Sequence, residues 1–252
     1  MSTPRRFLVD KIPTERMAIT LSSEESHHAI KVLRLTEGDS VFAVDGKGSG
    51  VLGVIQIHKG SKSEVKIAAT AAATKESPGS VIPVHITMAI LKGDAMDFAI
   101  EKCVELGIES ITPVVTDHTV VQIKKKGSES FQSRFQNISD QSLKQCERLT
   151  RMVVHPPMSL EEQLSKLSDV TVFWLSERAE NGKTLSKTVL ETSLPLHILS
   201  GPEGGWSKLE QELLIRSKNI IPVSLSPLIL RGETSVIAAA AIAGETLRSK
   251  LR

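Results

Sequence analysis

The chain has 252 residues, of which 40% are hydrophobic and 24% are charged, and this composition excludes a collagen-like or largely disordered polypeptide. Its six Phe and two Trp, with no Tyr, argue against RNA recognition by stacking of bases on an aromatic platform. The formal net charge of +2 lacks the strongly basic balance of a small dedicated nucleic-acid domain, so any RNA contact must depend on local charge.

Local charge shows where RNA contacts are expected, and cysteine usage shows which cross-links and metal sites are excluded. Residues 1–75 contain 11 basic and 8 acidic side chains, which places the basic excess in the first part of the chain. Cys103 and Cys146 lack a CxxC spacing, so neither a disulfide framework nor a structural zinc site is expected. No apolar signal-peptide core follows the start, and no stretch approaches 18 uninterrupted apolar residues. We therefore expect a cytoplasmic protein without a metal and without membrane contact.

The first 75 residues have the pattern of short strands separated by turns, which predicts a small β-barrel domain over residues 1–75. The expected strands are residues 18–21, 40–45, 51–58 and 64–71. Ser22 or Ser23 can cap a helix over residues 23–35. Residues 72–79 contain Pro78 and Gly79 and are predicted to be a linker.

From residue 80 onward, continuous apolar runs alternate with amphipathic segments, which predicts an α/β domain over residues 80–252 with a parallel sheet covered on both faces. The expected strands are residues 84–91, 110–115, 170–175, 196–200 and 220–224. The expected helices are residues 94–106, 131–149, 207–218 and 234–250. Ser207 and Glu210 form the sequence pattern of a capping box, and the four alanines of residues 238–241 favour close packing of the last helix.

Two loops are expected at the carboxyl ends of strands, where open α/β sheets bind ligands. The glycine loop, residues 201–205, reads Gly-Pro-Glu-Gly-Gly and precedes a capped helix. Glycines let the backbone approach a ligand, although a tight structural turn explains the same sequence. The leucine loop, residues 225–231, reads Leu-Ser-Pro-Leu-Ile-Leu-Arg. If their strands are neighbours, the two loops form one pocket with Arg231, Glu203 and Glu233 at its mouth.

The two loops together resemble the signature of the SPOUT class of methyltransferases, and specifically the RsmE-type family that methylates N3 of a uridine in 16S ribosomal RNA. Further matches follow the family's order along nearly the whole chain: Arg5-Arg6-Phe7, His28, Val32-Leu33-Arg34, Gly38-Asp39, Lys92, Lys102, Glu105-Leu106-Gly107, Gln145-Cys146 and Arg148. The resemblance implies a PUA-like RNA-binding barrel, a SPOUT domain with a carboxyl-terminal trefoil knot, and a homodimer. It also implies S-adenosylmethionine as cofactor and small-subunit ribosomal RNA, within a 30S particle, as partner.

The resemblance also implies roles for individual residues. The cofactor-binding residues would be Leu199, Gly201, Gly204, Gly205, Leu225, Ser226, Leu228 and Leu230. The RNA-binding residues would be Arg5, Arg6, Arg34, Lys92, Lys102 and Arg148. Lys92 and Lys102 could equally be solvated or, with Glu101 or Glu105, form ion pairs.

The chain departs from the family pattern at four positions, which are Ser226, Leu228, His118 and Glu147. The family usually has glycine at the first of these, often a basic residue at the second and third, and frequently glycine at the fourth. These departures concern RNA contacts more than cofactor binding, which depends on backbone groups.

Methylation of uracil N3 requires loss of its proton. If that proton titrates two to three units above neutrality, reaching the anion costs about 3 to 4 kcal/mol. A fixed guanidinium beside a ring carbonyl would offset much of that cost, and Arg231 is the candidate. Glu203 or Glu233 could be the general base, although acidic residues beside helix starts are also ordinary capping groups. A non-catalytic RNA-binding assembly factor that keeps the fold is the alternative function.

Overall fold

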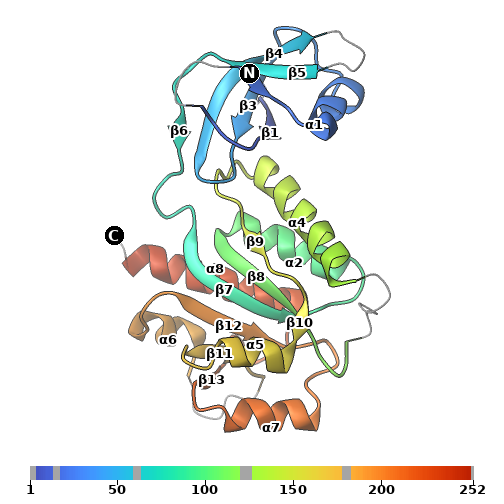
Figure 1. The fold of residues 1–252 in the computed structure, drawn as a ribbon. Coiled ribbons are helices and arrows are strands. Elements are labelled where there is room, and N and C mark those ends of the chain that lie inside the picture. The colour runs from blue at the N-terminus through green and yellow to red at the C-terminus, as the bar shows by residue number, and fades with distance from the viewer. Residues whose placement is uncertain (1–3, 14–17, 59–63, 120–126, 178–182, 251–252) are drawn as a thin grey trace. The chain divides into compact units, whose positions relative to one another are not determined.

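The computed structural model describes residues 4–13, 18–58, 64–119, 127–177 and 183–250 (Figure 1). The chain packs as two compact units. Unit 1 comprises Met1–Ser80 and Leu143–Arg151, and unit 2 comprises Val81–Ser142 and Met152–Arg252. Residues 143–151, which the sequence pattern assigned to the second domain, thus pack with the first.

Unit 1 is built on a small, mostly antiparallel sheet. Its elements are β1 (Arg5–Leu8), β2 (Ile19–Thr20), α1 (Ser23–His27), η1 (His28–Val32), β3 (Ser40–Val44), β4 (Ser49–His58), β5 (Glu64–Ala69) and β6 (Thr74–Lys75). The strand order is β1-β3-β4-β5-β2, with β6 paired to β4 and only β1 parallel to its neighbour. Alternate residues such as Val41, Ala43, Val65 and Ile67 are fully buried and form the core with Phe7.

The four strands predicted in this part of the chain are confirmed with small shifts in their ends. Strands β1 and β6, which have four and two residues, were not predicted, and β6 lies within the residues predicted to be a linker. The predicted helix over residues 23–35 is shorter in the structure. Ser22 caps α1 by accepting a hydrogen bond from the Glu25 N–H, and the chain then continues as a single π-helical turn that ends at Val32.

The segment Leu143–Arg151 is fastened to the rest of unit 1 by polar contacts. One carboxylate oxygen of Glu76 accepts hydrogen bonds from the Leu149 and Thr150 N–H groups at 2.7 and 2.6 Å. Arg6 donates to the Glu147 carbonyl at 3.0 Å and pairs with its carboxylate at 3.2 Å. Glu147 has a φ of +66°, a conformation that glycine adopts at lowest cost, which explains why a glycine suits this position. The Arg6 contacts help to hold Glu147 there.

Unit 2 contains a parallel sheet with helices on both faces. Its elements are β7 (Ile82–Ala89), α2 (Asp94–Glu105), β8 (Ile108–Val115), α4 (Ser128–Gln145), β9 (Val153–Val154), β10 (Met158–Ser159), α5 (Leu160–Lys166), β11 (Val172–Leu175), α6 (Leu185–Glu191), β12 (Leu196–Ser200), α7 (Lys208–Arg216), β13 (Ile220–Val223) and α8 (Gly232–Lys250). The strand order is β10-β8-β7-β12-β11-β13, with β9 beside β8. Every pairing in this sheet is parallel, as the continuous apolar runs predicted.

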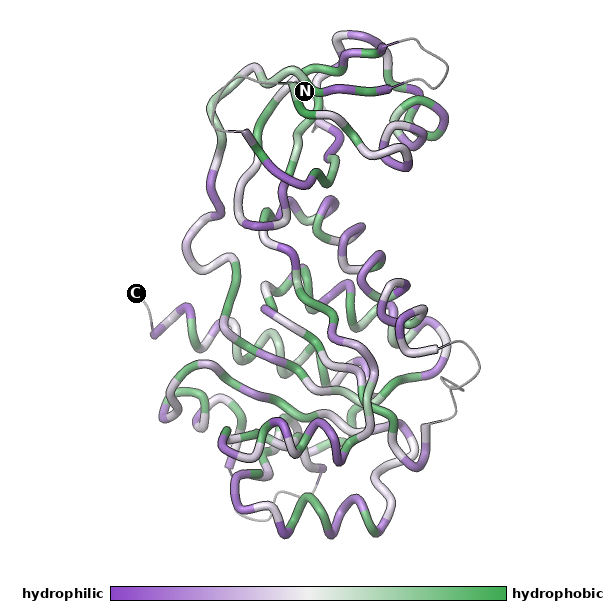
Figure 2. Tube along the Cα trace, viewed as in Figure 1, coloured by the Kyte–Doolittle hydropathy of each residue, from purple (hydrophilic) through white to green (hydrophobic). Residues whose placement is uncertain are grey.

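The two faces of this sheet are covered differently. Helices α5 and α7 share an apolar cluster with β11 and β12, whose members include Leu160, Leu199 and Leu214. Helix α8 contacts α2, α6, β7 and β12, and its small residues Ala239, Ala240, Ala243 and Gly244 are buried. The close packing predicted for this helix is therefore confirmed. The colouring of Figure 2 shows α7 with alternating hydrophilic and hydrophobic bands, as expected of a helix with one solvent-facing side.

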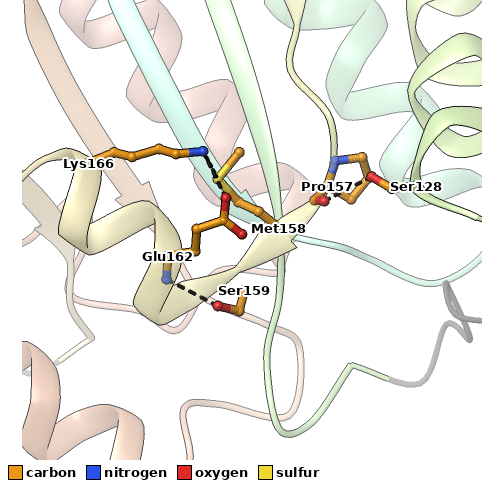
Figure 3. Close-up of polar contacts among 6 residues, drawn as sticks. All are labelled: Ser128, Pro157, Met158, Ser159, Glu162 and Lys166. Atoms are coloured by element: carbon orange, nitrogen blue, oxygen red, sulfur yellow. Dashed lines mark hydrogen bonds and ion pairs between the residues drawn. The ribbon is translucent and has the colours of Figure 1, made fainter.

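Strand β10 and the start of α5 are held by short-range polar contacts (Figure 3). Ser159 caps α5 by accepting a hydrogen bond from the Glu162 N–H at 3.1 Å, and Lys166 pairs with the Glu162 carboxylate at 2.9 Å. Ser128, in the first turn of α4, donates to the Pro157 carbonyl at 3.0 Å. The capped start fixes where the chain turns from β10 into α5.

The five strands and four helices predicted for this part of the chain are confirmed, whereas β9, β10, α5 and α6 were not predicted. These four elements have two to seven residues each, and such short segments give no clear period. Among the described residues, no helix is both long enough and apolar enough to cross a membrane.

Candidate functional site

The glycine and leucine loops leave the same edge of the sheet, because β12 and β13 run parallel within it. The sequence-based pocket was conditional on these two strands being neighbours, and this condition is not met, since β11 lies between them. With a spacing of about 4.8 Å between strands, the loops start about 10 Å apart.

The glycine loop is packed closely at one end and open at the other. A Cβ built on Gly201 would lie 2.7 Å from Nε1 of Trp206, so only glycine fits against the indole. The Gly205 N–H donates to the Pro202 carbonyl at 2.9 Å and closes a turn, in which Gly205 has a φ of +71°. A Cβ on Gly205 would have nothing within 4 Å. The loop thus presents bare backbone to open space.

Trp206 was not singled out from the sequence. It is half-buried against the cluster that contains Leu199, and Leu199 is fully buried at the end of β12. The signal available in the sequence was that one of the chain's two tryptophans directly follows the glycine loop.

The leucine loop is held by its own serines while its apolar centre faces outward. The Leu228 N–H donates to Oγ of Ser226 at 3.0 Å, and Ser224 Oγ donates to the Ser226 carbonyl at 3.2 Å. Ser226 therefore closes this turn with its side chain and its carbonyl group. The glycine that is usual at this position in the family would close it through the freedom of its backbone. Leu228 and Ile229 are 75% and 77% exposed, whereas Leu225 and Leu230 are half-buried.

The end of the leucine loop returns toward the middle of the sheet. A Cβ on Gly232, the first residue of α8, would lie 2.7 Å from Cδ2 of Leu91, which follows β7. Arg231 is therefore positioned close to the β7 end of the edge, with an exposed side chain. Among the residues that the structure describes, none forms a hydrogen bond or ion pair with its guanidinium.

The two candidate general bases lie in different settings. Glu203 is exposed within the glycine-loop turn. Glu233 lies in the first turn of α8 and is half-buried, where a carboxylate is favoured by the helix dipole. The last helix was predicted to begin at residue 234, but α8 already begins at Gly232. Glu233 is therefore a helical residue.

A third segment meets the glycine loop, and sequence reasoning had noted only one of its residues, His118, as a departure from the family. This segment is the β8 turn, residues 116–119, which follows β8. His118 Nδ1 lies 2.7 Å from the Gly205 carbonyl oxygen. The Asp117 N–H donates to Oε1 of Glu210 at 3.0 Å, and Ser207 Oγ donates to the Asp117 carboxylate at 2.5 Å. The capping box of Ser207 and Glu210 is confirmed.

The edge offers backbone polar groups and aliphatic side chains to a ligand. No group of three or more His, Cys, Asp or Glu side chains able to hold a metal ion occurs in the described ranges. The open space beside Gly205 and the half-buried Leu225 and Leu230 provide backbone polar groups and aliphatic surface. These are the features that a nucleoside with an uncharged ring requires.

Among the candidate RNA-binding residues of unit 2, Lys92 is exposed directly after β7. Lys102 pairs with Glu105 at 2.6 Å and lies 5.3 Å from the ring centroid of Phe98. The hydrogen bond to Glu105 raises the pKa of Lys102. Lys92 is thus exposed, whereas Lys102 is already paired within its helix.

The four candidate RNA-binding arginines of unit 1 differ in exposure. Arg5 and Arg34 are exposed. Arg6 has its guanidinium 4.6 Å from the ring centroid of Phe42 in addition to its ion pair with Glu147. Arg148 is only 5% exposed.

Comparisons with known proteins identify both parts of the chain. Residues 78–244 match the family model of an RNA methyltransferase domain, and residues 21–67 match that of an RNA methyltransferase PUA domain. Ribosomal RNA small subunit methyltransferase E of Synechocystis sp. is 30% identical over 92% of this chain and 74% of its own length. The protein of the same name from Bacillus subtilis is 27% identical over 92% of this chain and 90% of its own.

Solved structures agree with this result. The crystal structure of a ribosomal RNA small subunit methyltransferase E from Neisseria gonorrhoeae, bound to S-adenosyl methionine, superposes with a TM-score of 0.80 at 26% identity. It covers 95% of this chain and 96% of that one. The chain therefore belongs to the ribosomal RNA small subunit methyltransferase E family, as its motifs had indicated.

Proposed function

We propose that this protein transfers a methyl group from S-adenosylmethionine to small-subunit ribosomal RNA, at N3 of a uridine in the 16S molecule. The observation that carries the proposal is the open glycine-loop backbone at the carboxyl edge of a parallel sheet, in a chain that shares its fold along almost its full length with a relative bound to this cofactor. A non-catalytic assembly factor is disfavoured, because the exposed Arg231 and both loops are retained.

The cofactor would lie along the edge between the two loops. The residues proposed to hold it are Leu199, Gly201, Gly204, Gly205, Leu225, Ser226, Leu228 and Leu230. When bound, S-adenosylmethionine supplies an electrophilic methyl group on a sulfonium. The chain contributes backbone groups of the glycine loop for polar contacts and aliphatic side chains of the leucine loop for the adenine ring. Leu228 is 75% exposed, so it would gain contacts on binding.

Arg231 is proposed to stabilise the uridine anion. Loss of the N3 proton leaves negative charge on the ring carbonyls, and a guanidinium donates two hydrogen bonds in a fixed plane. Preorganised donors of this kind contribute about 10²- to 10³-fold in rate. The side chain of Arg231 is exposed at the end of the leucine loop, where it can reach an RNA base that approaches from solvent.

The proton acceptor is proposed to be Glu203 or Glu233. Glu203 is exposed on the glycine-loop turn and meets the need for a carboxylate accessible to RNA. Glu233 lies in the first turn of α8 and is half-buried, so it is less accessible to RNA than Glu203.

The remaining features follow from the same family assignment. Phosphate contacts are proposed for Arg5, Arg6, Arg34, Lys92, Lys102 and Arg148, of which Arg5, Arg34 and Lys92 are exposed. Unit 1 would thus position the RNA without reading its sequence. We place the reaction in the cytoplasm, on a 30S particle, with a homodimeric enzyme. A trefoil knot is supported by the path of the chain, which leaves β13 at the sheet edge and returns to Leu91 beside β7.

Two measurements test the function. Calorimetry should detect binding of S-adenosylmethionine, and mass analysis of 16S RNA from cells lacking the protein should show one uridine without its methyl group. An unchanged modification map would rule out the enzymatic assignment, and binding to RNA without any binding of the cofactor would support the assembly factor instead.

The role of Arg231 is tested separately. Arg231→Ala should lower kcat about 100-fold while the Kd for S-adenosylmethionine stays within about threefold, because the guanidinium acts on the uridine. Arg231→Lys, which keeps the charge but loses the planar fork, should retain an intermediate rate. Equal losses in kcat and cofactor affinity in Arg231→Ala would assign the residue to cofactor binding.

A further inference from the structure

The β8 turn is closed by its own hydrogen bonds and has no role in the cofactor site proposed above. The Thr116 N–H donates to Oγ1 of Thr119 at 2.9 Å, and the Thr119 N–H donates to the Thr116 carbonyl at 2.9 Å. These bonds close the turn at its base and leave Asp117 and His118 exposed at its tip. The turn therefore presents two polar side chains in a fixed orientation.

The tip of this turn reaches past the neighbouring strand of the sheet. In the strand order, β7 lies between β8 and β12, yet the turn after β8 contacts the residues that follow β12. The contact is anchored on Glu210, which is only 5% exposed and whose carboxylate accepts from the N–H groups of both Asp117 and Ser207. The turn thus crosses the carboxyl end of β7 and is fastened to the start of α7.

His118 extends this fastening to the glycine loop itself. Its Nδ1 lies 2.7 Å from the Gly205 carbonyl oxygen, and because a carbonyl can only accept, Nδ1 must carry the hydrogen. The position of a Cβ on Gly204 would be 3.3 Å from Cβ of His118. The histidine therefore restrains Gly205 by a hydrogen bond and lies beside Gly204.

We infer that His118 is a positioning residue, which holds the glycine loop in the conformation that receives the methyl donor; this inference rests on the proposed function. Gly204 and Gly205 have no side chains of their own to fix the loop, and Gly205 has a φ of +71° that the sequence permits but does not enforce. The hydrogen bond from His118 orders the loop before the cofactor binds, so less conformational entropy is lost on binding. At this position, where the family commonly has a basic side chain, this chain has a histidine that donates to the Gly205 carbonyl.

The experiment compares two substitutions that differ in their ability to donate a hydrogen bond. His118→Asn keeps an N–H donor close to the position of Nδ1, whereas His118→Leu removes the donor and keeps a side chain of similar bulk. Calorimetry with S-adenosylmethionine should give a Kd within about twofold of the wild type for His118→Asn and about five- to tenfold higher for His118→Leu. His58→Leu, at an exposed histidine of β4 in unit 1, is the control and should bind like the wild type.

A second measurement separates positioning from stability. Because the His118 side chain is exposed, both variants should unfold within about 2 °C of the wild type, as surface substitutions usually do. Amide hydrogen exchange at Gly204 to Trp206 should be faster in His118→Leu and unchanged in His118→Asn.

The outcomes distinguish this inference from the proposed function. Wild-type protein that does not bind S-adenosylmethionine overturns both. Wild-type binding with an unchanged Kd in His118→Leu overturns the inference alone, and so does an equal loss of affinity in His118→Asn, which would show that the hydrogen bond is not the cause. A raised Kd accompanied by an equally large loss of thermal stability would assign His118 to folding.

Discussion

Gly201→Ala is the sharpest test of the site geometry. The new Cβ would lie 2.7 Å from Nε1 and 2.8 Å from Cε2 of Trp206, distances at which one of the two groups must move. Trp206 packs against the cluster of Leu199, so the indole cannot shift freely. Overpacking of this kind costs about 1 to 3 kcal/mol. Gly201 is not in the left-handed region, so the cost is steric and not conformational.

The expected result follows from that magnitude. A loss of about 2 kcal/mol lowers the unfolding midpoint of a chain of this size by about 4 to 8 °C, which circular dichroism measures directly. Calorimetry should show weaker binding of S-adenosylmethionine, because displacement of Trp206 moves the loop that precedes it. Gly205→Ala is the matched control. It meets no atom within 4 Å but has a φ of +71°, so it should cost about 1 kcal/mol from backbone strain alone.

The physical cause can be isolated with a double substitution. Trp206→Phe removes the indole atoms that the new Cβ would meet, so Gly201→Ala should cost about 1 to 2 kcal/mol less in that background than in the wild type. If the two substitutions are additive, the clash is not the cause and the reasoning about this loop is wrong.

Two further predictions concern the rest of unit 2. Burial and the neighbouring His85, whose ring lies 4.8 Å from that of His197, lower the pKa of His197 to about 4. Folding therefore favours the neutral imidazole, and its contribution to stability is full above pH 6.5. As the pH falls from 6.5 toward 4, this contribution should be lost by at most about 1.4 kcal/mol per pH unit. Chemical unfolding of His197→Gln at pH 7 and pH 5 should show a smaller drop than the wild type, and an identical drop would contradict this. Glu210→Gln keeps a capping side chain but one acceptor fewer for the N–H groups of Ser207 and Asp117, so it should lower stability by about 1 to 3 kcal/mol in urea titration. Unchanged stability would mean that the Asp117 N–H is satisfied elsewhere.

The amino-acid sequence determined the local structure of the site and most of the elements around it. Ser207 and Glu210 are three residues apart, so their capping box forms within one turn and depends on no distant contact. The long apolar strands and the helices of unit 2 were predicted for the same reason, because their periodicity is contained within each segment. The family resemblance was also carried by local motifs, and the comparisons confirmed it.

Only the tertiary structure decided which of these segments meet. The placement of β11 between β12 and β13, the burial of Arg148 and the return of Gly232 to Leu91 depend on pairings between residues far apart in the chain. The contact of His118 with Gly205 joins residues 87 positions apart. Such contacts form because the sheet brings the carboxyl ends of its strands to one edge, and strand order is a property of the whole packed sheet that no single segment encodes.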